Sequence, residues 1–228
     1  MNIIDTASPN FNARKSDVID MLILHYTDLK TVTESLDILT SPKMEVSAHY
    51  LIDEDGTVHQ IVDEENRAWH AGKSYWRDIT DVNSHSIGIE IQNPGHSNGY
   101  RAFPTLQMDS VLELCTAIIK RHPTISAQNI IAHSDIAPDR KSDPGELFNW
   151  ALLAKNGIGE WPSSTKAITD NHDLHKDLIA YGYNPNLDLE TLTRAFQRHF
   201  EPAVFEKNQA GIPTKNTHGL LRQLLNAQ

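Results

Sequence analysis

The chain has 228 residues, which is long enough for one medium-sized domain and a smaller second one. Its 20 basic and 30 acidic residues give a net charge of -10, which argues against a nucleic-acid partner because duplex binding requires clustered Lys and Arg. The single cysteine, Cys115, excludes an internal disulfide.

The N-terminal part of the chain predicts alternating strands and helices. The nearly continuous apolar run 18–25 is typical of a buried strand, and residues 31–40 are typical of a short helix. Residues 46–52 and 57–62 flank Asp55-Gly56, a dipeptide that favours the turn of a β-hairpin.

Residues 86–91 alternate between the two faces of a predicted strand. The three isoleucines lie on one face, while Gly88 and Glu90 lie on the other. Farther along, apolar positions at helical spacing over 105–122 predict a long helix, which Pro123 ends.

A short strand at 130–132 leads into His133, and residues 146–154 are expected to form a closing helix. Together these elements predict an α/β fold in which helices flank a central mixed β-sheet.

The C-terminal part predicts a small three-helix module. Gly, Pro and Ser cluster without a period over 157–165, as in a linker. We therefore expect two domains, 1–160 and 167–228. The second domain contains three amphipathic helices, expected at 171–181, 189–200 and 217–226.

Two histidines follow or end short apolar strands, where α/β proteins often build their sites. They are His25 and His133, and Asp143 lies ten residues after the second on an irregular loop. Two imidazoles and one carboxylate are a normal set of catalytic zinc ligands. The alternative interpretation is that the histidines are satisfied by backbone groups and that Asp143 is a capping residue. The sequence contains no H-E-x-x-H, G-x-S-x-G, Walker or dinucleotide-binding motif.

Several stretches of the sequence, taken together, resemble one enzyme family. They are HYT (25–27), SAHYLIDEDGTVHQIV (47–62), RAWHAG (67–72), NSHSIGIEIQNPG (83–95) and HSDIAPDRKSDPG (133–145). The family is that of the zinc-dependent type 2 N-acetylmuramoyl-L-alanine amidases, the AmpD- and AmiD-like enzymes. The resemblance covers roughly residues 15–150 in order, and it implies a central mixed β-sheet with helices on its faces.

The resemblance also implies the residues of the active site. One zinc ion per chain would be held by His25, His133 and Asp143. Glu90 would take a proton from the attacking water and deliver it to the departing amine. Lys141 would stabilise the oxyanion that forms when the amide carbonyl is attacked. The alternative interpretations are that Glu90 is a solvated strand residue and that Lys141 is a surface residue.

Other marked residues have weaker signals. Trp69, His70 and Asn83 are candidate substrate-binding residues, with a place in the core, at the rim or in loop support as the alternative. His49 is expected to be structural and Cys115 to lie in the apolar core.

The C-terminal strings LIAYGY (178–183) and RAFQRHF (194–200) resemble a three-helix peptidoglycan-binding module. The usual Asp-Gly turn before the last helix of such modules is replaced here by residues 209–212. The alternative to wall binding is that these helices only dock on the catalytic domain.

The expected activity is hydrolysis of the amide bond between N-acetylmuramic acid, or its 1,6-anhydro form, and L-alanine in peptidoglycan or muropeptides. The alternatives are a non-catalytic muropeptide recognition protein and a zinc peptidase that cuts within the stem peptide. Because the N-terminus has no secretory signal and no stretch approaches the ~20 apolar residues of a membrane span, we expect a cytoplasmic protein. A periplasmic or wall-associated location is the alternative.

Overall fold

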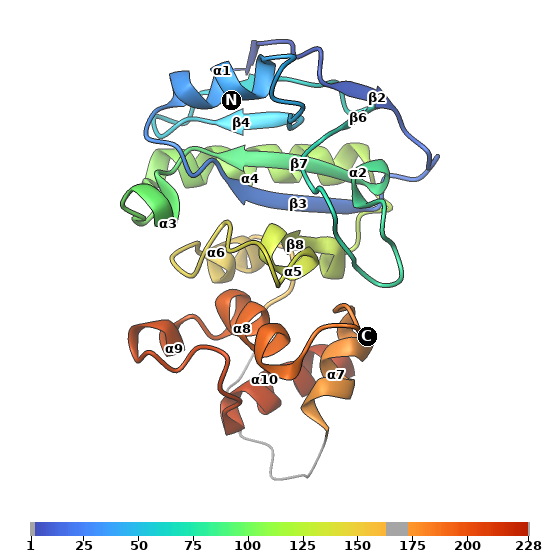
Figure 1. Cartoon of the computed structure of the whole chain (residues 1–228), viewed down its shortest axis with the longest axis vertical. Helices are drawn as coiled ribbons and strands as arrows, with labels where there is room; N and C mark the ends of the chain where they lie inside the picture. The colour runs from blue at the N-terminus through green and yellow to red at the C-terminus, as the bar shows by residue number, and fades with distance from the viewer. Residues whose placement is uncertain (1–2, 163–172, 228) are drawn as a thin grey trace.

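A computed structural model of the chain describes residues 3–162 and 173–227. Figure 1 shows strands and helices mixed in the first part of the chain and helices alone in the last part. In chain order the elements are β1 (Ile3–Asp5), β2 (Phe11–Ala13), β3 (Met21–Tyr26), α1 (Val32–Thr40), β4 (Tyr50–Ile52), β5 (Val58–Gln60), β6 (Asn66–Ala68), α2 (Val82–His85), β7 (Ser86–Ile91), α3 (Gly95–Asn98), α4 (Thr105–Arg121), a 3-10 turn (Ala127–Asn129), β8 (Ile130–Ala132), α5 (His133–Ile136), α6 (Trp150–Lys155), α7 (Leu174–Tyr181), α8 (Leu189–Phe200), α9 (Ala203–Glu206) and α10 (Lys215–Asn226).

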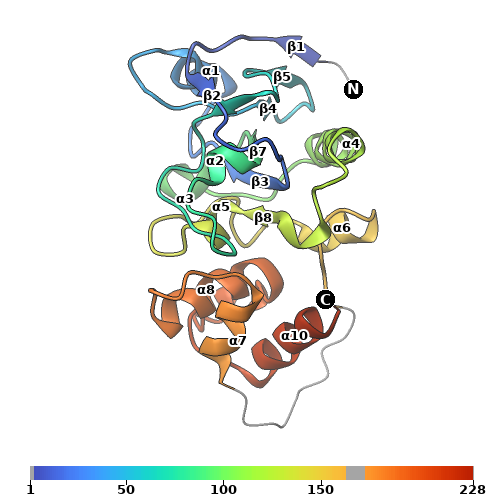
Figure 2. The same ribbon diagram turned by 90° about the vertical axis from the view of Figure 1, so that its right-hand side faces the viewer.

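The centre of the molecule is a six-stranded sheet with the strand order β1-β5-β4-β7-β3-β8. β4 and β5 pair antiparallel, and all other neighbours in this sheet pair parallel. β2 and β6 form a separate antiparallel pair. Figure 2 shows helices on both sides of the central sheet. The predicted fold class, a mixed sheet flanked by helices, is therefore confirmed.

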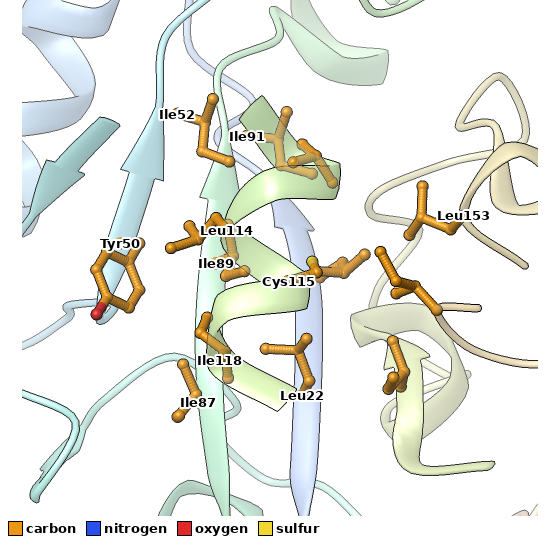
Figure 3. Close-up of a cluster of buried hydrophobic side chains, with 14 of the residues drawn as sticks. Leu22, Tyr50, Ile52, Ile87, Ile89, Ile91, Leu114, Cys115, Ile118 and Leu153 are labelled. Atoms are coloured by element: carbon orange, nitrogen blue, oxygen red, sulfur yellow. The ribbon is translucent and has the colours of Figure 1, made fainter. Parts of the chain in front are cut away.

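One face of the sheet packs on α4. The isoleucines of β7 lie on this face, as their alternation predicts, and Cys115 of α4 lies fully buried among them. Burying one side chain of this size stabilises the fold by roughly 1.5–3 kcal/mol, so this cluster is a major part of the core. Figure 3 shows the cluster, which includes Leu22, Tyr50, Ile52, Ile87, Ile89, Ile91, Leu114, Cys115, Ile118 and Leu153.

The C-terminal helices cover the β8 edge of the sheet (Figure 1 and Figure 2). Ile23 of β3 and Ile131 of β8 belong to the same buried cluster as Leu178 of α7 and Phe196 of α8. The two parts of the chain therefore share one continuous apolar core. Of the segments expected here, residues 163–165 of the linker and 171–172 of the first helix lie outside the described residues.

Buried polar contacts reinforce this packing around Asp135, a residue of α5 that is 1% exposed. The Tyr183 hydroxyl donates a hydrogen bond to one carboxylate oxygen of Asp135 at 2.6 Å. The His199 Nδ1 atom lies 2.7 Å from the other oxygen. The Asp135 carboxylate also accepts from the Ala132 N–H at 2.9 Å. The C-terminal helices are thus tied directly to the turn that follows β8.

The sequence predictions differ from the structure mainly at short elements. The closing helix α6 begins at Trp150 and not at Glu146, so its predicted start was wrong. The reason is local, because the Asn149 side chain caps the helix by accepting from the Leu152 N–H at 3.0 Å. Among the elements that the sequence analysis did not find are β1, β2, β6, α2, α3 and α9.

Within residues 3–162 and 173–227, no helix is both long enough and apolar enough to cross a lipid bilayer.

Candidate metal centre and active site

The parallel strands β3, β7 and β8 bring three candidate residues to one edge. His25 of β3 and Glu90 of β7 are paired in the register, so their side chains leave the same face of the sheet. Leu24 is paired with Ala132 in the parallel register of β3 and β8, so the next residues, His25 and His133, lie beside each other at the ends of these strands. The carboxyl ends of parallel strands are the usual place for a site in such a sheet.

Asp143 comes to this edge from the irregular loop that follows α5. The Ser134 N–H donates to the Asp143 carbonyl oxygen at 3.0 Å, and the Tyr100 hydroxyl donates to the Pro144 carbonyl oxygen at 2.9 Å. Gly145 has a φ of +88°, and a Cβ atom there would overlap the Tyr100 hydroxyl. The loop therefore needs a glycine at this point in order to pass under Tyr100.

The three candidate ligands converge on one point. His25 Nδ1 lies 2.9 Å from His133 Nδ1 and 3.0 Å from Asp143 Oδ2, and His133 Nδ1 lies 2.9 Å from the same oxygen. All three side chains are buried. Burial, and next the neighbouring His133, lower the pKa of His25 to about 4, which keeps this imidazole neutral and able to bind a metal. Burial alone would raise the pKa of Asp143, but the two histidines hold it well below its usual range.

The donor set fits a divalent metal. Ligand atoms at about 2.0 Å from a tetrahedral ion lie about 3.3 Å from one another, close to the 2.9–3.0 Å separations found here. The second ring nitrogen of His133 lies 3.2 Å from the Ala71 carbonyl oxygen. A metal-binding histidine characteristically donates its other N–H to such a group. His25, His133 and Asp143 therefore form a candidate three-residue metal site.

A cavity of about 310 Å³ opens beside this site. Glu90, Lys141 and Trp69 are among the residues that line it. The Glu90 Oε2 atom has no hydrogen-bond partner among the described residues. Burial, and next the charge of Asp143, raise the pKa of Glu90 well above its usual value, while the charge of Lys141 opposes this shift. Glu90 is thus a carboxyl group poised to exchange a proton at the cavity wall.

Lys141 is exposed on the loop two residues before Asp143. Its charge also acts to lower the pKa of His25, which places it within electrostatic reach of the metal site. Its backbone N–H is held by the Ala137 carbonyl oxygen at 3.0 Å, so the chain is fixed on the side of α5.

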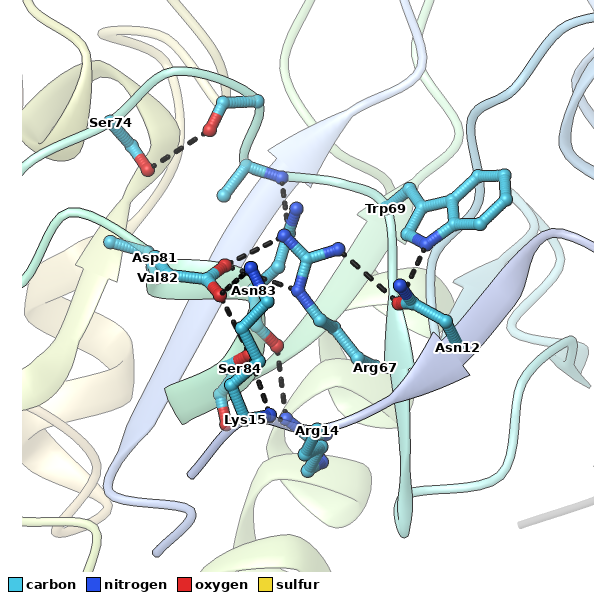
Figure 4. Close-up of polar contacts among 12 residues, drawn as sticks. Asn12, Arg14, Lys15, Arg67, Trp69, Ser74, Asp81, Val82, Asn83 and Ser84 are labelled. Carbon is cyan, nitrogen blue, oxygen red and sulfur yellow. Dashed lines mark hydrogen bonds and ion pairs between the residues drawn. The ribbon is translucent and has the colours of Figure 1, made fainter. Parts of the chain in front are cut away.

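The predicted substrate-binding residues lie at different depths. Trp69 is partly exposed, and its indole N–H donates to Asn12 Oδ1 at 3.1 Å (Figure 4). His70 and Asn83 are buried, with 8% and 5% of their surface exposed. The Asn83 Oδ1 atom accepts from the backbone N–H groups of His70 and Ala71 at 3.1 and 2.8 Å. Asn83 therefore holds the backbone beside the metal site.

His49 is fully buried in the sheet. Its Nδ1 atom accepts from the Gly88 N–H at 2.9 Å, and its Nε2 atom lies 2.9 Å from the Arg14 guanidinium. Burial, and next the charge of Arg14, lower the pKa of His49 to about 3. These contacts support the structural role that the sequence predicts for it.

Two residues near the site were not identified from the sequence. Arg140 donates from Nε to the Lys73 carbonyl oxygen at 2.8 Å and also bonds the Ala71 carbonyl oxygen. The Tyr26 hydroxyl lies 2.8 Å from His96 Nδ1 and 2.9 Å from Ser142 Oγ, and its ring lines the cavity. The sequence could have indicated both residues by their position, because Arg140 is adjacent to Lys141 and Tyr26 is adjacent to His25.

Comparison with known proteins gives a consistent result. The family described as N-acetylmuramoyl-L-alanine amidase matches residues 14–146. The chain is 35% identical over 215 residues to the N-acetylmuramoyl-L-alanine amidase AmiD of Escherichia coli, covering 82% of this chain and 76% of AmiD. It is 34% identical over 161 residues to the 1,6-anhydro-N-acetylmuramyl-L-alanine amidase AmpD of Haemophilus influenzae, covering 63% of this chain and 85% of AmpD.

Solved structures extend the similarity to the C-terminal helices. A structure of Escherichia coli AmiD, in complex with a substrate, matches with a TM-score of 0.80 and 34% identity, covering 93% of this chain and 91% of AmiD. AmpDh3 of Pseudomonas aeruginosa matches with a TM-score of 0.82 and 32% identity, covering 92% of each chain. Together with the fold and the three converging ligands, these similarities show that the chain belongs to the N-acetylmuramoyl-L-alanine amidase family of hydrolases.

Proposed function

We propose that this chain hydrolyses the amide bond between the lactyl group of N-acetylmuramic acid, or its 1,6-anhydro form, and the L-alanine of the stem peptide. Family membership supports this activity. The similar AmiD was solved with anhydro-N-acetylmuramic acid-L-Ala-D-gamma-Glu-L-Lys, and AmpDh3 with an anhydromuramic pentapeptide. The observation that carries the proposal is the convergence of His25, His133 and Asp143 on one point at the cavity that Glu90 also lines.

Zinc is the metal that we propose for the three ligands, because two imidazoles and a carboxylate match its preference in hydrolytic sites. When bound, zinc polarises a carbonyl group and lowers the pKa of a water molecule to about 7. His25, His133 and Asp143 would hold the ion beside the cavity that His133, Asp143 and Glu90 line.

The other residues act on the substrate and on protons. Glu90 takes the proton of the attacking water and delivers it to the departing amine, a task that suits a carboxyl group with a raised pKa. The Lys141 ammonium group neutralises the charge that develops on the amide oxygen. Trp69 lines the cavity wall and contacts the substrate there.

Product analysis tests the proposal. Purified protein is incubated with a 1,6-anhydro-muropeptide and with intact sacculi, and the products are identified by mass spectrometry. We expect free stem peptide beginning with L-alanine, and no product after the protein is treated with a zinc chelator. Cleavage within the stem peptide would indicate a peptidase. Tight muropeptide binding without turnover in zinc-replete buffer would indicate a recognition protein, and either result would refute the proposal.

The division into domains 1–160 and 167–228 stays a prediction, as does peptidoglycan binding by the second. Cosedimentation of the protein with isolated sacculi, in the presence of chelator, measures wall binding apart from catalysis. The cytoplasmic location also stays a prediction, which cell fractionation with immunodetection tests.

A further inference from the structure

We infer that His70 is a positioning residue of the metal centre: it accepts a hydrogen bond from His25 Nε2 and so commits His25 to binding the metal through Nδ1. This inference rests on the metal site of the proposed function. It assigns to His70 a role different from the substrate contact that the sequence suggests.

The hydrogen-bond chain below His25 allows only one arrangement of protons. The Ser86 hydroxyl donates to the Val82 carbonyl oxygen at 2.7 Å, so its single hydrogen is already used. Ser86 Oγ lies 3.2 Å from His70 Nε2, which must therefore be the donor. A neutral imidazole that donates from Nε2 has a bare Nδ1. His70 Nδ1 lies 3.0 Å from His25 Nε2 and accepts its hydrogen. The Nδ1 atom of His25 is then left with a free lone pair.

Ala71, the residue after His70, determines the tautomer of the second histidine ligand, His133, in the same way. His133 Nε2 lies 3.2 Å from the Ala71 carbonyl oxygen, which can only accept, and 3.4 Å from Arg140 Nη2, which can only donate. Arg140 Nη2 already donates to the Ala71 carbonyl oxygen, so the shorter contact favours a hydrogen on His133 Nε2. The Nδ1 atom of His133 is then bare as well. His70 and Ala71 are themselves held together, because both of their N–H groups donate to Asn83 Oδ1. One two-residue segment thus sets the tautomers of both histidines.

Both bare nitrogens lie 2.9–3.0 Å from the Asp143 carboxylate and 2.9 Å from each other. With no hydrogen left to place between these atoms, their lone pairs repel unless a cation lies among them. The hydrogen bonds from His25 to His70 and from His133 to the Ala71 carbonyl oxygen therefore prepare the three ligands for a metal.

Gly88 explains how the His70 ring reaches its place. A Cβ atom at Gly88 would overlap the Cγ, Nδ1 and Cδ2 atoms of His70, so the ring lies directly on the bare backbone of β7. Glycine in the interior of a strand is unfavourable, and close approach of another group is one reason for its presence. Gly88 is two residues before Glu90 on the same face, and the ring of His70 therefore supports the sheet beneath the site.

Substrate contact is the competing role for His70, and its hydrogen bonds disfavour it. The ring lines the cavity but is buried, and both ring nitrogens have partners within the protein, His25 and Ser86. No polar atom of the side chain remains to bind a sugar or a peptide.

The test compares His70→Leu with His70→Asn and with Ser86→Ala in the full-length protein. Zinc affinity is measured by competition with a chromophoric chelator, alongside kcat and KM on a muropeptide. Loss of an outer-shell partner typically weakens metal binding by about 10- to 100-fold, which is the drop expected for His70→Leu. His70→Asn keeps an acceptor close to the Nδ1 position and should recover most of the affinity. Ser86→Ala should weaken zinc binding by about threefold to tenfold, the equivalent of one hydrogen bond. KM should change little in all three.

A matched control is His122→Asn, which removes a histidine bonded to Glu64 at 2.7 Å and belonging to neither the metal site nor the cavity lining. It should leave zinc affinity unchanged. If circular dichroism shows that His70→Leu does not fold, the Asn and Ser86 variants decide. Unchanged zinc affinity in Ser86→Ala and in a folded His70→Leu variant would overturn the inference, as would a raised KM with normal zinc binding. A wild-type protein that binds no zinc would instead refute the proposed function.

Discussion

The carboxylate of Glu64 permits a quantitative prediction about stability. Glu64 lies away from the metal site, with a side chain that is 12% exposed, and joins β4 to the end of α4. It accepts from the Tyr50 hydroxyl at 2.9 Å and from the Arg121 guanidinium at 2.7 Å, and it lies 2.7 Å from His122 Nε2. Burial alone would raise the pKa of Glu64, but the bonds from Arg121, His122 and Tyr50 outweigh it and lower that pKa from 4.5 to about 2.

The size of the effect follows from linkage. A folded-state pKa that lies below the unfolded-state value stabilises the fold above the unfolded pKa, and this stability is lost as pH falls through the folded pKa. A shift from 4.5 to about 2 corresponds to about 3 kcal/mol at pH 7, at about 1.4 kcal/mol per unit. At pH 3 the same arithmetic leaves about 1.4 kcal/mol, because the unfolded state is protonated there while Glu64 in the folded state is largely ionised.

Denaturation of Glu64→Gln and wild type by urea at pH 7 and pH 3 measures this difference. The variant should be less stable by about 3 kcal/mol at pH 7, equivalent to about 6–12 °C in Tm for a chain of this size. The gap should shrink to about half or less at pH 3. A gap that stays constant between the two pH values, or a variant as stable as wild type at pH 7, would refute the reasoning.

The remaining predictions concern the metal site and its support. Removal of metal with a chelator should lower Tm, and added zinc should restore it, since a ligand at 1,000 times its Kd stabilises by about 4 kcal/mol; an unchanged Tm would contradict the metal site. Lys141→Met should reduce kcat by about two to three orders of magnitude without reducing zinc affinity; loss of zinc instead would show a different role. Tyr183→Phe should reduce the free energy of unfolding by about 1–3 kcal/mol, because it leaves a buried oxygen of Asp135 with one donor fewer; urea denaturation measures it, and no change would contradict it.

The elements that could be predicted from the sequence are those whose side chains repeat with the period of the backbone. β3, β7 and α4 carry long apolar patterns because each is buried along its length, and their positions were predicted closely. β1 and β2 have three residues each, all exposed, so no pattern marks them. The start of α6 was wrong because a single side chain, Asn149, decides where that helix begins.

The candidate site could be predicted in part for a similar reason. His25 and His133 mark the ends of strands, so their approach follows from parallel pairing. Asp143 was a candidate ligand from its place on the loop after His133, and the family resemblance added the roles of Glu90 and Lys141. The ring nitrogen that each histidine presents could not be predicted, since it depends on hydrogen bonds between segments far apart in the chain. His25 and His70 are separated by 45 residues, and His133 and Ala71 by 62.

The packing of the C-terminal helices on the β8 edge matters when the chain is truncated or fused to another protein. β8 pairs with β3 on one side, and on the other side the C-terminal helices shield it. A truncation after the closing helix would expose Ile131 and the outer backbone edge of β8 to solvent. An exposed edge strand can pair with the edge strand of another molecule and so promote aggregation. A chimera that contains only the amidase part of this chain therefore needs another segment that covers the β8 edge. Without one, we expect the protein to aggregate and little soluble protein to be recovered.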